Sequence, residues 1–181
     1  LEKWRSHLNI IHRNVPFKGL SKARNYGVKI SNYNILAFPD DDCFYETDTL
    51  KKVIDHFNNK IDTEVLICKK KEYSRNISTE KVISNKIKKV NSILDLFMAK
   101  ASSNQIFIKS NILARLEKEV FDPILGLGSD TLYGSSEETD LLLRLYKKKS
   151  NILINNDIVV FHPSTYPNPR KSYLYGLGRN K

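Results

Sequence analysis

The chain has 181 residues, of which 40% are hydrophobic and 28% are charged. This balance is typical of a globular protein and excludes a disordered one, and the length suits a single domain over residues 1–181 with a buried core. No apolar run approaches the roughly 20 residues that a membrane-spanning helix needs, so we expect no such helix in this sequence.

The formal net charge is +10, and lysine clusters supply part of it. The clusters are Lys69–Lys71, Lys86–Lys89 and Lys147–Lys149. They would attract anionic partners such as nucleic acid, lipid headgroups or phosphorylated substrates. Lys, Asn and Ile are abundant throughout, however, so the charge alone selects none of these. The two cysteines, Cys43 and Cys68, lack the spacing of a disulfide framework or a metal site and favour a reducing compartment.

Apolar and helical patterns alternate along the chain, which predicts an α/β layered domain. The expected elements of the first part are a short strand at 9–12, a helix at 21–31, a buried strand at 34–38, a helix at 48–58 and a strand at 64–68. Thr47 is the expected cap of the second helix. The apolar face of that helix carries Leu50, Val53, Ile54 and Phe57.

Beyond Cys68 the sequence becomes basic and polar, and residues 69–89 have the composition of a long loop. The elements expected after it are a helix at 92–100, a strand at 105–109, a structured loop at 121–136, an amphipathic helix at 137–148, strands at 152–154 and 158–161, and an irregular tail at 163–181. No internal repeat and no linker indicates a second domain.

Three adjacent carboxylates, Asp40, Asp41 and Asp42, follow the buried strand at 34–38. Like charges side by side repel, so three aspartates at a strand end indicate a bound cation. Mg²⁺ or Mn²⁺, held by one or two carboxylates and completed by substrate phosphates, would meet that need. The alternative is a polar turn in which one aspartate caps the next helix and the others face water. These residues alone do not distinguish a metal site from a polar turn.

A second acidic group, Glu137 and Glu138, lies at the start of the last helix. Backbone N–H groups and the positive end of the helix dipole favour ionised carboxylates there, and an ionised carboxylate can accept a proton from a bound hydroxyl. A structural role is the alternative, because residues 135–138 (SSEE) match an S-x-x-E capping box. Asp140 and Arg144 are likewise spaced for an ordinary i,i+4 ion pair.

His162 and two arginines are further candidates. His162 directly follows the apolar strand at 158–161, where an imidazole can complete a metal shell or meet a phosphate; a structural histidine is the alternative. Arg24 would orient the aspartate loop or meet phosphate oxygens, although an exposed helical arginine is equally ordinary. Arg179, in the segment 175–179 (YGLGR), would belong to a basic segment that closes over a phosphate, or to an ordinary tail.

The order of these motifs adds to what each indicates alone. Residues 19–27 (GLSKARNYG) followed by 35–42 (ILAFPDDD) resemble the central block of family 2 glycosyltransferases of the GT-A fold. In that family a G-x-S-x-A-R-N-x-G segment precedes an apolar strand that ends in D-x-D. Residues 121–126 (FDPILG) and 134–144 (GSSEETDLLLR) are similar to the family's loop and its E-D-x-D-L-x-x-R helix, and His162 with its following proline also matches. The resemblance covers nearly the whole chain.

By that resemblance, the fold is a GT-A-like mixed sheet flanked by helices. Asp40 and Asp42 correspond to the D-x-D element that holds Mn²⁺ or Mg²⁺ against the diphosphate of a nucleotide-sugar donor, and His162 would lie near this metal. Asp41 would join Asp40, Arg24 and Arg179 among the donor-binding residues. Glu138 takes the place of the family's catalytic aspartate base and Glu137 the preceding acidic position. Glutamate keeps the carboxylate but lengthens the side chain, so the choice between the two stays open.

The sequence departs from the family at its start. Only the end of the nucleotide-binding region is recognisable, around residues 9–12, and the first nucleotide-binding strands and their uridine-contacting acid are absent. Open α/β sheets bind ligands beyond the carboxyl ends of adjacent strands. We therefore expect an N-terminally incomplete GT-A domain that folds but binds its donor poorly.

The resemblance implies a metal-dependent inverting glycosyltransferase that moves a sugar from a nucleotide-diphosphate donor, most often UDP-linked, to a glycan or lipid-linked acceptor in bacterial surface polysaccharide synthesis. We expect a cytoplasmic protein, held by its basic clusters at the inner face of the membrane, with no nucleic acid partner. One alternative is a sugar-nucleotide nucleotidyltransferase, which also pairs an α/β sheet with metal-binding aspartates. The other is a non-catalytic basic binding module, whose binding would depend steeply on salt and not on the aspartates.

Overall fold

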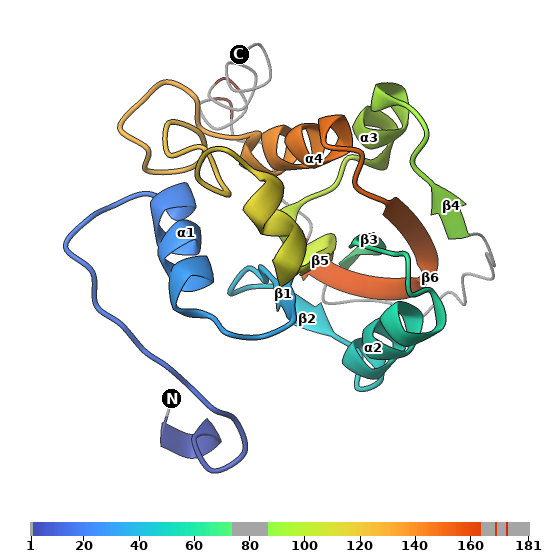
Figure 1. Ribbon diagram of the computed structural model, residues 1–181. Helices are drawn as coiled ribbons and strands as arrows, with labels where there is room; N and C mark the ends of the chain where they lie inside the picture. Colours follow the sequence, from blue (N-terminus) through green and yellow to red (C-terminus); the bar gives the residue numbers. More distant parts are fainter. Residues whose placement is uncertain (1, 74–86, 164–168, 170–172, 174–181) are drawn as a thin grey trace.

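The computed structural model describes residues 2–73, 87–163, 169 and 173, and it shows a mixed sheet flanked by helices (Figure 1). The strands are β1 (Ile35–Ala37), β2 (Phe44–Tyr45), β3 (Val65–Tyr73), β4 (Ile87–Lys89), β5 (Ile106–Lys109) and β6 (Ile152–Pro163). The α-helices are α1 (Leu20–Ile30), α2 (Thr49–Asn59), α3 (Ile93–Ala99) and α4 (Glu137–Lys147). The 3₁₀ helices are η1 (Glu2–Trp4), η2 (Ser103–Gln105) and η3 (Ser110–Arg115). Within the described residues, no helix combines the length and the apolarity needed to cross a bilayer.

The sheet has the strand order β1-β5-β3-β6-β2, and β4 pairs with β6 outside this path. β3 and β6 run parallel, whereas the other pairs are antiparallel. The aspartates follow β1, at one end of this order, and His162 lies near the end of β6. The elements that carry the candidate metal ligands are therefore connected through β5 and β3.

The central strands contain consecutive apolar residues, whose side chains point alternately to the two faces of the sheet. The core therefore lies on both faces. On β5, Ile106 and Ile108 belong to one buried cluster and Phe107 to the other. The first cluster contains Leu96 of α3 together with leucines of α4, and the second contains Val53 of α2. α3 and α4 therefore cover one face of the sheet and α2 covers the opposite face (Figure 1).

The predicted helices are all present, each within one residue of its expected bounds at either end. The expected strands at 34–38 and 105–109 are present as β1 and β5, and the one at 64–68 forms the first part of β3. Among these segments, the strands and α4 have strong apolar periodicity and bury most of the corresponding side chains. The predicted α/β class is therefore confirmed.

Two expectations about strands and loops are wrong. Residues 9–12 form no strand, because no strand in the described part of the chain lies beside them to accept their hydrogen bonds. β3 continues through residues 69–73, predicted as loop, because these residues pair with residues 159–163 of β6. Residues 87–89, at the other end of the predicted loop, form β4, because they pair with residues 153–155 of β6. Residues 74–86 of the predicted loop lie outside the described residues, and so does most of the predicted tail at 163–181.

β6 joins two segments that the sequence predicts as separate strands. Its register against β3 shifts between Cys68 and Lys69, whose partners are Asn155 and Val159. The Asn155 Oδ1 atom accepts a 2.9 Å hydrogen bond from the Asp157 N–H, which is a local turn of the kind asparagine favours. The polar residues between the two predicted strands therefore form an irregularity within one strand.

Neither predicted helix cap is confirmed. α2 begins after Asp48, not Thr47, without a side-chain capping bond. Two residues of its predicted apolar face, Leu50 and Ile54, are more than half exposed. α4 begins after Ser136, which has a left-handed φ of 77° and also lacks a side-chain capping bond. The acidic side chains at the start of α4 therefore serve a purpose other than the predicted capping box.

Candidate metal and catalytic centre

α1 is fixed to the loop before α4 by side chains on one face of the helix. The Ser21 hydroxyl donates a 2.7 Å hydrogen bond to the Leu125 carbonyl. Asn25 makes two hydrogen bonds with the backbone of Phe121, donating from Nδ2 at 2.7 Å and accepting at Oδ1 at 2.8 Å. The ring of Phe121 in turn lies 5.4 Å from the guanidinium carbon of Arg24, within the range of a cation–π contact. The 19–27 motif therefore positions the loop and the arginine together.

Arg24 lies at the centre of an acidic cluster. Its Nη1 atom is 3.2 Å from Glu137 Oε1 and 3.2 Å from Glu138 Oε1. Its Nη2 atom donates to Asp40 Oδ1 at 3.3 Å and to Ser103 Oγ at 2.7 Å. The side chain is only 9% exposed. Arg24 is therefore not an ordinary exposed helical arginine, and it links the aspartate loop to the start of α4. Its contact with phosphate oxygens stays a prediction.

Asp40 divides its two oxygens between different partners. Oδ1 accepts hydrogen bonds from Arg24 and from the Ser103 hydroxyl, the latter at 3.2 Å. Oδ2 lies 3.9 Å from His162 Nε2. The turn that follows is closed by Cys43, whose backbone N–H lies 3.3 Å and whose Sγ lies 3.1 Å from the Asp40 carbonyl oxygen. The Asp40 carboxylate therefore contacts the Arg24 cluster with one oxygen and faces His162 with the other.

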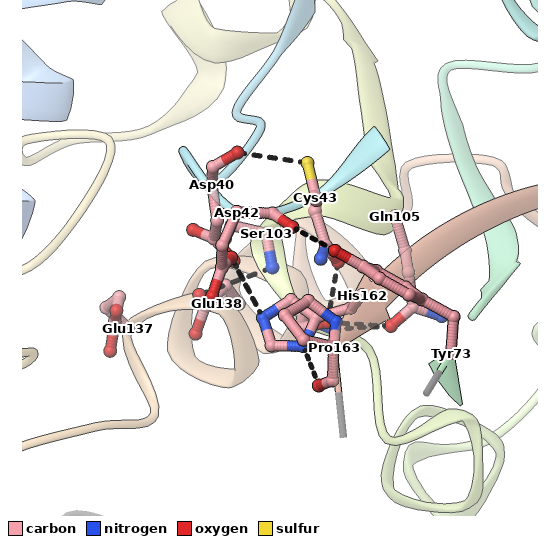
Figure 2. Close-up of polar contacts among 12 residues, drawn as sticks. Asp40, Asp42, Cys43, Tyr73, Ser103, Gln105, Glu137, Glu138, His162 and Pro163 are labelled. Carbon is pink, nitrogen blue, oxygen red and sulfur yellow. Dashed lines mark hydrogen bonds and ion pairs between the residues drawn. The ribbon is translucent and has the colours of Figure 1, made fainter. Parts of the chain in front are cut away.

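Asp40, Asp42 and His162 form a candidate metal-binding group, since one ligand atom from each lies within 4.8 Å of the others. Asp42 Oδ1 is 3.3 Å from His162 Nε2, and the imidazole points toward it (Figure 2). His162 Nδ1 is 2.8 Å from the Pro163 carbonyl. Because a carbonyl only accepts, Nδ1 carries a proton, and Nε2 is the ring nitrogen that faces the aspartates.

A divalent cation among the three groups would offset the repulsion between the two carboxylates and could accept the Nε2 lone pair as a third ligand. Two carboxylates and one imidazole leave positions open for phosphate oxygens or water. This donor set fits Mn²⁺ or Mg²⁺, which accept oxygen ligands and, for Mn²⁺, an imidazole. The residues present therefore fit the predicted metal.

The two glutamates differ in their surroundings. The Glu137 side chain is 5% exposed, and its Oε2 is buried without a hydrogen-bond partner among the described residues. Burial, together with the neighbouring Glu138 carboxylate, raises the pKa of Glu137 from its ordinary 4.5 to about 7. Glu138 Oε1 accepts from Arg24 and, at 3.3 Å, from the Ser103 N–H. Its Oε2 accepts no hydrogen bond from any residue that the structure describes.

Most of the predicted site residues meet in this centre. They are Arg24, Asp40, Asp42, Glu137, Glu138 and His162. Asp41 is exposed and is not part of the metal-ligand group, and Arg179 lies outside the described residues, so their donor-binding roles stay predictions. Ser103 is a contact residue that no sequence motif indicates. It lies in a short polar stretch between α3 and β5, where nothing in the spacing distinguishes it from a loop serine.

With this geometry in view, comparison with known proteins is informative. The family model for glycosyl transferase family 2 matches residues 1–117. The chain belongs to this family. The resemblance predicted from the motifs is therefore confirmed, and the match covers α1, the aspartates and Ser103, whereas Glu137, Glu138 and His162 lie beyond it. No curated protein matches the chain.

Solved structures of S. aureus TarS are similar in fold. TarS 1–349 in complex with UDP-GlcNAc is 18% identical, with a TM-score of 0.62 over 94% of this chain and 47% of that chain. A second crystal structure of TarS is 19% identical, with a TM-score of 0.65 over 90% of this chain and 28% of that chain. TarS 1–349 alone is 16% identical, with a TM-score of 0.64 over 99% of this chain and 56% of that chain. The chain thus shares the GT-A fold and spans about half the length of the TarS 1–349 structures.

Proposed function

We propose that this chain carries the metal and acid–base centre of an inverting glycosyltransferase that uses a nucleotide-diphosphate sugar, with UDP as the expected nucleotide. Membership of glycosyl transferase family 2 supports sugar transfer, and similarity to a structure that holds UDP-GlcNAc supports the donor class. The observation that carries the proposal is the position of Asp40, which contacts the Arg24 cluster through one oxygen and faces His162 with the other.

The residues that would hold the metal are Asp40, Asp42 and His162. When bound, a divalent ion would offset the negative charge that develops on the nucleotide diphosphate as it leaves. With such an ion bound, the diphosphate is expected beside Asp40, Asp42 and His162, because phosphate oxygens would complete the open side of the ligand set. Asp41 and Arg179 remain proposed donor contacts.

Glu138 is the proposed general base. An acceptor hydroxyl attacks the anomeric carbon, the new C–O bond forms as the bond to the diphosphate breaks, and the hydroxyl proton passes to Glu138 Oε2. Attack on the face opposite the leaving group inverts the configuration at that carbon. Arg24 and Ser103 hold Oε1, which orients the carboxylate and leaves Oε2 for the proton. The enclosed Glu137 is a positioning residue in this scheme.

For the acceptor we propose a glycan or lipid-linked sugar in bacterial surface polysaccharide synthesis, with the protein acting on the cytoplasmic side of the membrane. The family resemblance supports this class of acceptor. The sugar that is moved and the hydroxyl that receives it would be identified by offering nucleotide sugars that differ at one position.

The test is metal-dependent release of UDP from UDP-GlcNAc, alone and with a glycan acceptor, by the purified full-length protein in the presence of Mn²⁺. Asp42→Asn should lower the Mn²⁺-dependent rate at least about a hundredfold, since it removes a charged ligand from the metal and weakens charge stabilisation at the leaving group. Asp62→Asn is the matched control, because it removes the same charge at an exposed position outside the ligand group. Normal metal-dependent rates in Asp42→Asn would overturn the proposal. Release of pyrophosphate from a nucleoside triphosphate would favour a nucleotidyltransferase instead.

A further inference from the structure

α3 presents an apolar stripe that packs against nothing in the described part of the chain. The exposed side chains are Ile93 (45%), Leu94 (67%), Phe97 (53%) and Met98 (71%). They are spaced at i, i+3 and i+4, so they share one face of the helix. Leu96 is the apolar residue of α3 that enters the core. The helix thus directs most of its apolar surface away from the protein.

The position of α3 is well defined despite this exposure. Ser92 and Asp95 form a reciprocal capping box at its start, and Lys88 forms an ion pair with Asp95 at 2.5 Å. α3 also packs beside α4 (Figure 1). The apolar stripe is therefore presented by an ordered helix, and its exposure is not the result of a loose helix end.

A basic hollow lies next to the helix. It has a volume of about 420 Å³ and is lined in part by Lys89, Asn91, Tyr146, Lys147 and Lys149. None of its three lysines forms an ion pair with a described residue. The hollow therefore concentrates positive charge that acidic side chains do not neutralise.

Asn91 connects the basic hollow with the start of α3. Asn91 lines the hollow and immediately precedes the cap of α3. Its carbonyl accepts a 2.8 Å hydrogen bond from the Tyr146 hydroxyl of α4, and its N–H donates to Asp95 Oδ2 at 3.0 Å. Through these contacts the basic hollow and the start of the apolar stripe are held at adjoining positions on the surface.

We propose that α3 and this basic hollow form a docking site for an anionic lipid surface. The stripe of α3 would enter the boundary between headgroups and acyl chains, and the lysines of the hollow would contact lipid phosphates. Apolar side chains alone suit many partners, but an adjoining cluster of unpaired lysines is complementary to a negatively charged bilayer. A single short helix gives a weak hydrophobic contribution, so the site requires both the apolar and the basic part.

α2 provides an internal comparison. It also exposes two apolar residues one turn apart, Leu50 and Ile54. Its lysines, however, are paired with aspartates on the same helix, Lys51 with Asp55 and Lys52 with Asp48. α2 therefore matches α3 in exposed apolar residues but lacks the uncompensated charge, which makes it the natural control.

The experiment is co-sedimentation of the purified full-length protein with vesicles of phosphatidylcholine alone and of phosphatidylcholine mixed with an equal part of phosphatidylglycerol. We expect binding to the mixed vesicles only, weakened by salt. Leu94→Ser with Met98→Ser should lower the partition coefficient by at least about tenfold, whereas Leu50→Ser with Ile54→Ser should leave it unchanged. All four side chains are exposed, so these changes should not unfold the protein.

The charge is tested separately. Lys147→Gln with Lys149→Gln should lower the partition coefficient by about tenfold, whereas Lys29→Gln with Lys60→Gln, which removes the same charge elsewhere, should have little effect. Inorganic phosphate should compete weakly, because it supplies the phosphate but not the apolar surface. Three results would overturn the proposal: equal binding to both vesicle types, unchanged binding by the α3 variant, or self-association in sedimentation velocity that the α3 variant abolishes while vesicle binding persists.

Discussion

Arg24 offers one positive charge to the carboxylates of Asp40, Glu137 and Glu138. In a largely buried cluster this leaves an excess of negative charge unless a proton or a cation joins it. The raised pKa of Glu137 supplies the first solution, since its carboxyl is partly protonated near neutral pH. A cation bound by Asp40, Asp42 and His162 would be the second solution. Individual residues in this centre thus take different charge states although their side chains are chemically alike.

The two glutamates are therefore predicted to respond differently to the same substitution. Glu138→Gln should lower kcat by about a hundredfold to ten-thousandfold, because it removes the proposed base. Glu137→Gln removes the same charge but keeps an oxygen that can accept from Arg24, so its effect on kcat should be smaller. Steady-state kinetics with UDP-sugar and Mn²⁺ measure both variants. A larger loss of kcat in Glu137→Gln would assign the base to Glu137.

Glu137 should also make the stability of the protein depend on pH. Its pKa is about 7 in the folded protein, above the ordinary 4.5 expected in the unfolded chain. Between these values the folded state binds more protons than the unfolded state, so the free energy of unfolding should fall as pH rises through this window and then level off. Glu137→Gln should remove this decline. Urea unfolding of the unchanged protein and of Glu137→Gln from pH 4 to pH 8 measures this decline. If the free energy of unfolding of the unchanged protein rose with pH relative to that of Glu137→Gln, the burial of Glu137 would be contradicted.

At the scale of elements, α1 connects parts of the site that lie far apart in sequence. Asn25 is predicted to be its main structural anchor, because both of its hydrogen bonds satisfy the backbone of the buried Phe121. Asn25→Ala should lower the free energy of unfolding by about 1–3 kcal/mol, since it leaves a buried donor and acceptor unpaired. Asn111→Ala, at an exposed position, should change it by less than about 0.5 kcal/mol. Urea denaturation measures both, and equal losses would show that the Asn25 bonds are not needed to hold the loop.

The elements that could be predicted from the sequence are those with strong apolar periodicity, such as α4 and β5. β6 could not be predicted as one strand, because Asn155 and Asp157 have the composition of a turn while the strand on either side continues against β3. The continuation of β3 through residues 69–73 could not be predicted for a related reason. Its lysines suit a solvent-facing strand as well as a loop, and only the pairing with β6 decides between them.

At the scale of the whole molecule, the site could be predicted only from the order of its motifs. Asp40, Arg24 and Glu138 come from separate segments, and local spacing allowed a turn, an exposed arginine and a capping box in their place. The family resemblance placed them in one centre. It did not indicate Ser103, or that Arg24 contacts both acidic groups, because those contacts depend on how η2 packs between β1 and α4.

Metal binding should stabilise the folded state, because the proposed ligands come from the turn between β1 and β2 and from β6, which are far apart in the sequence. A ligand that binds only the folded state at a hundred times its Kd adds about 2.7 kcal/mol. For a chain of this size each kcal/mol raises Tm by about 2–4 °C, so saturating Mn²⁺ should raise Tm by roughly 5–10 °C.

This increase in Tm, measured by thermal unfolding with Mn²⁺ and again after adding a chelator, should be lost in Asp42→Asn and in His162→Gln. It should persist in Asp41→Asn, which carries the same charge change outside the ligand group. If His162→Gln kept the full increase, the ion would be held by the aspartates without β6, and the metal would not link the turn to β6. If Asp41→Asn lost it as well, the effect would reflect the net charge of the turn and not a defined site.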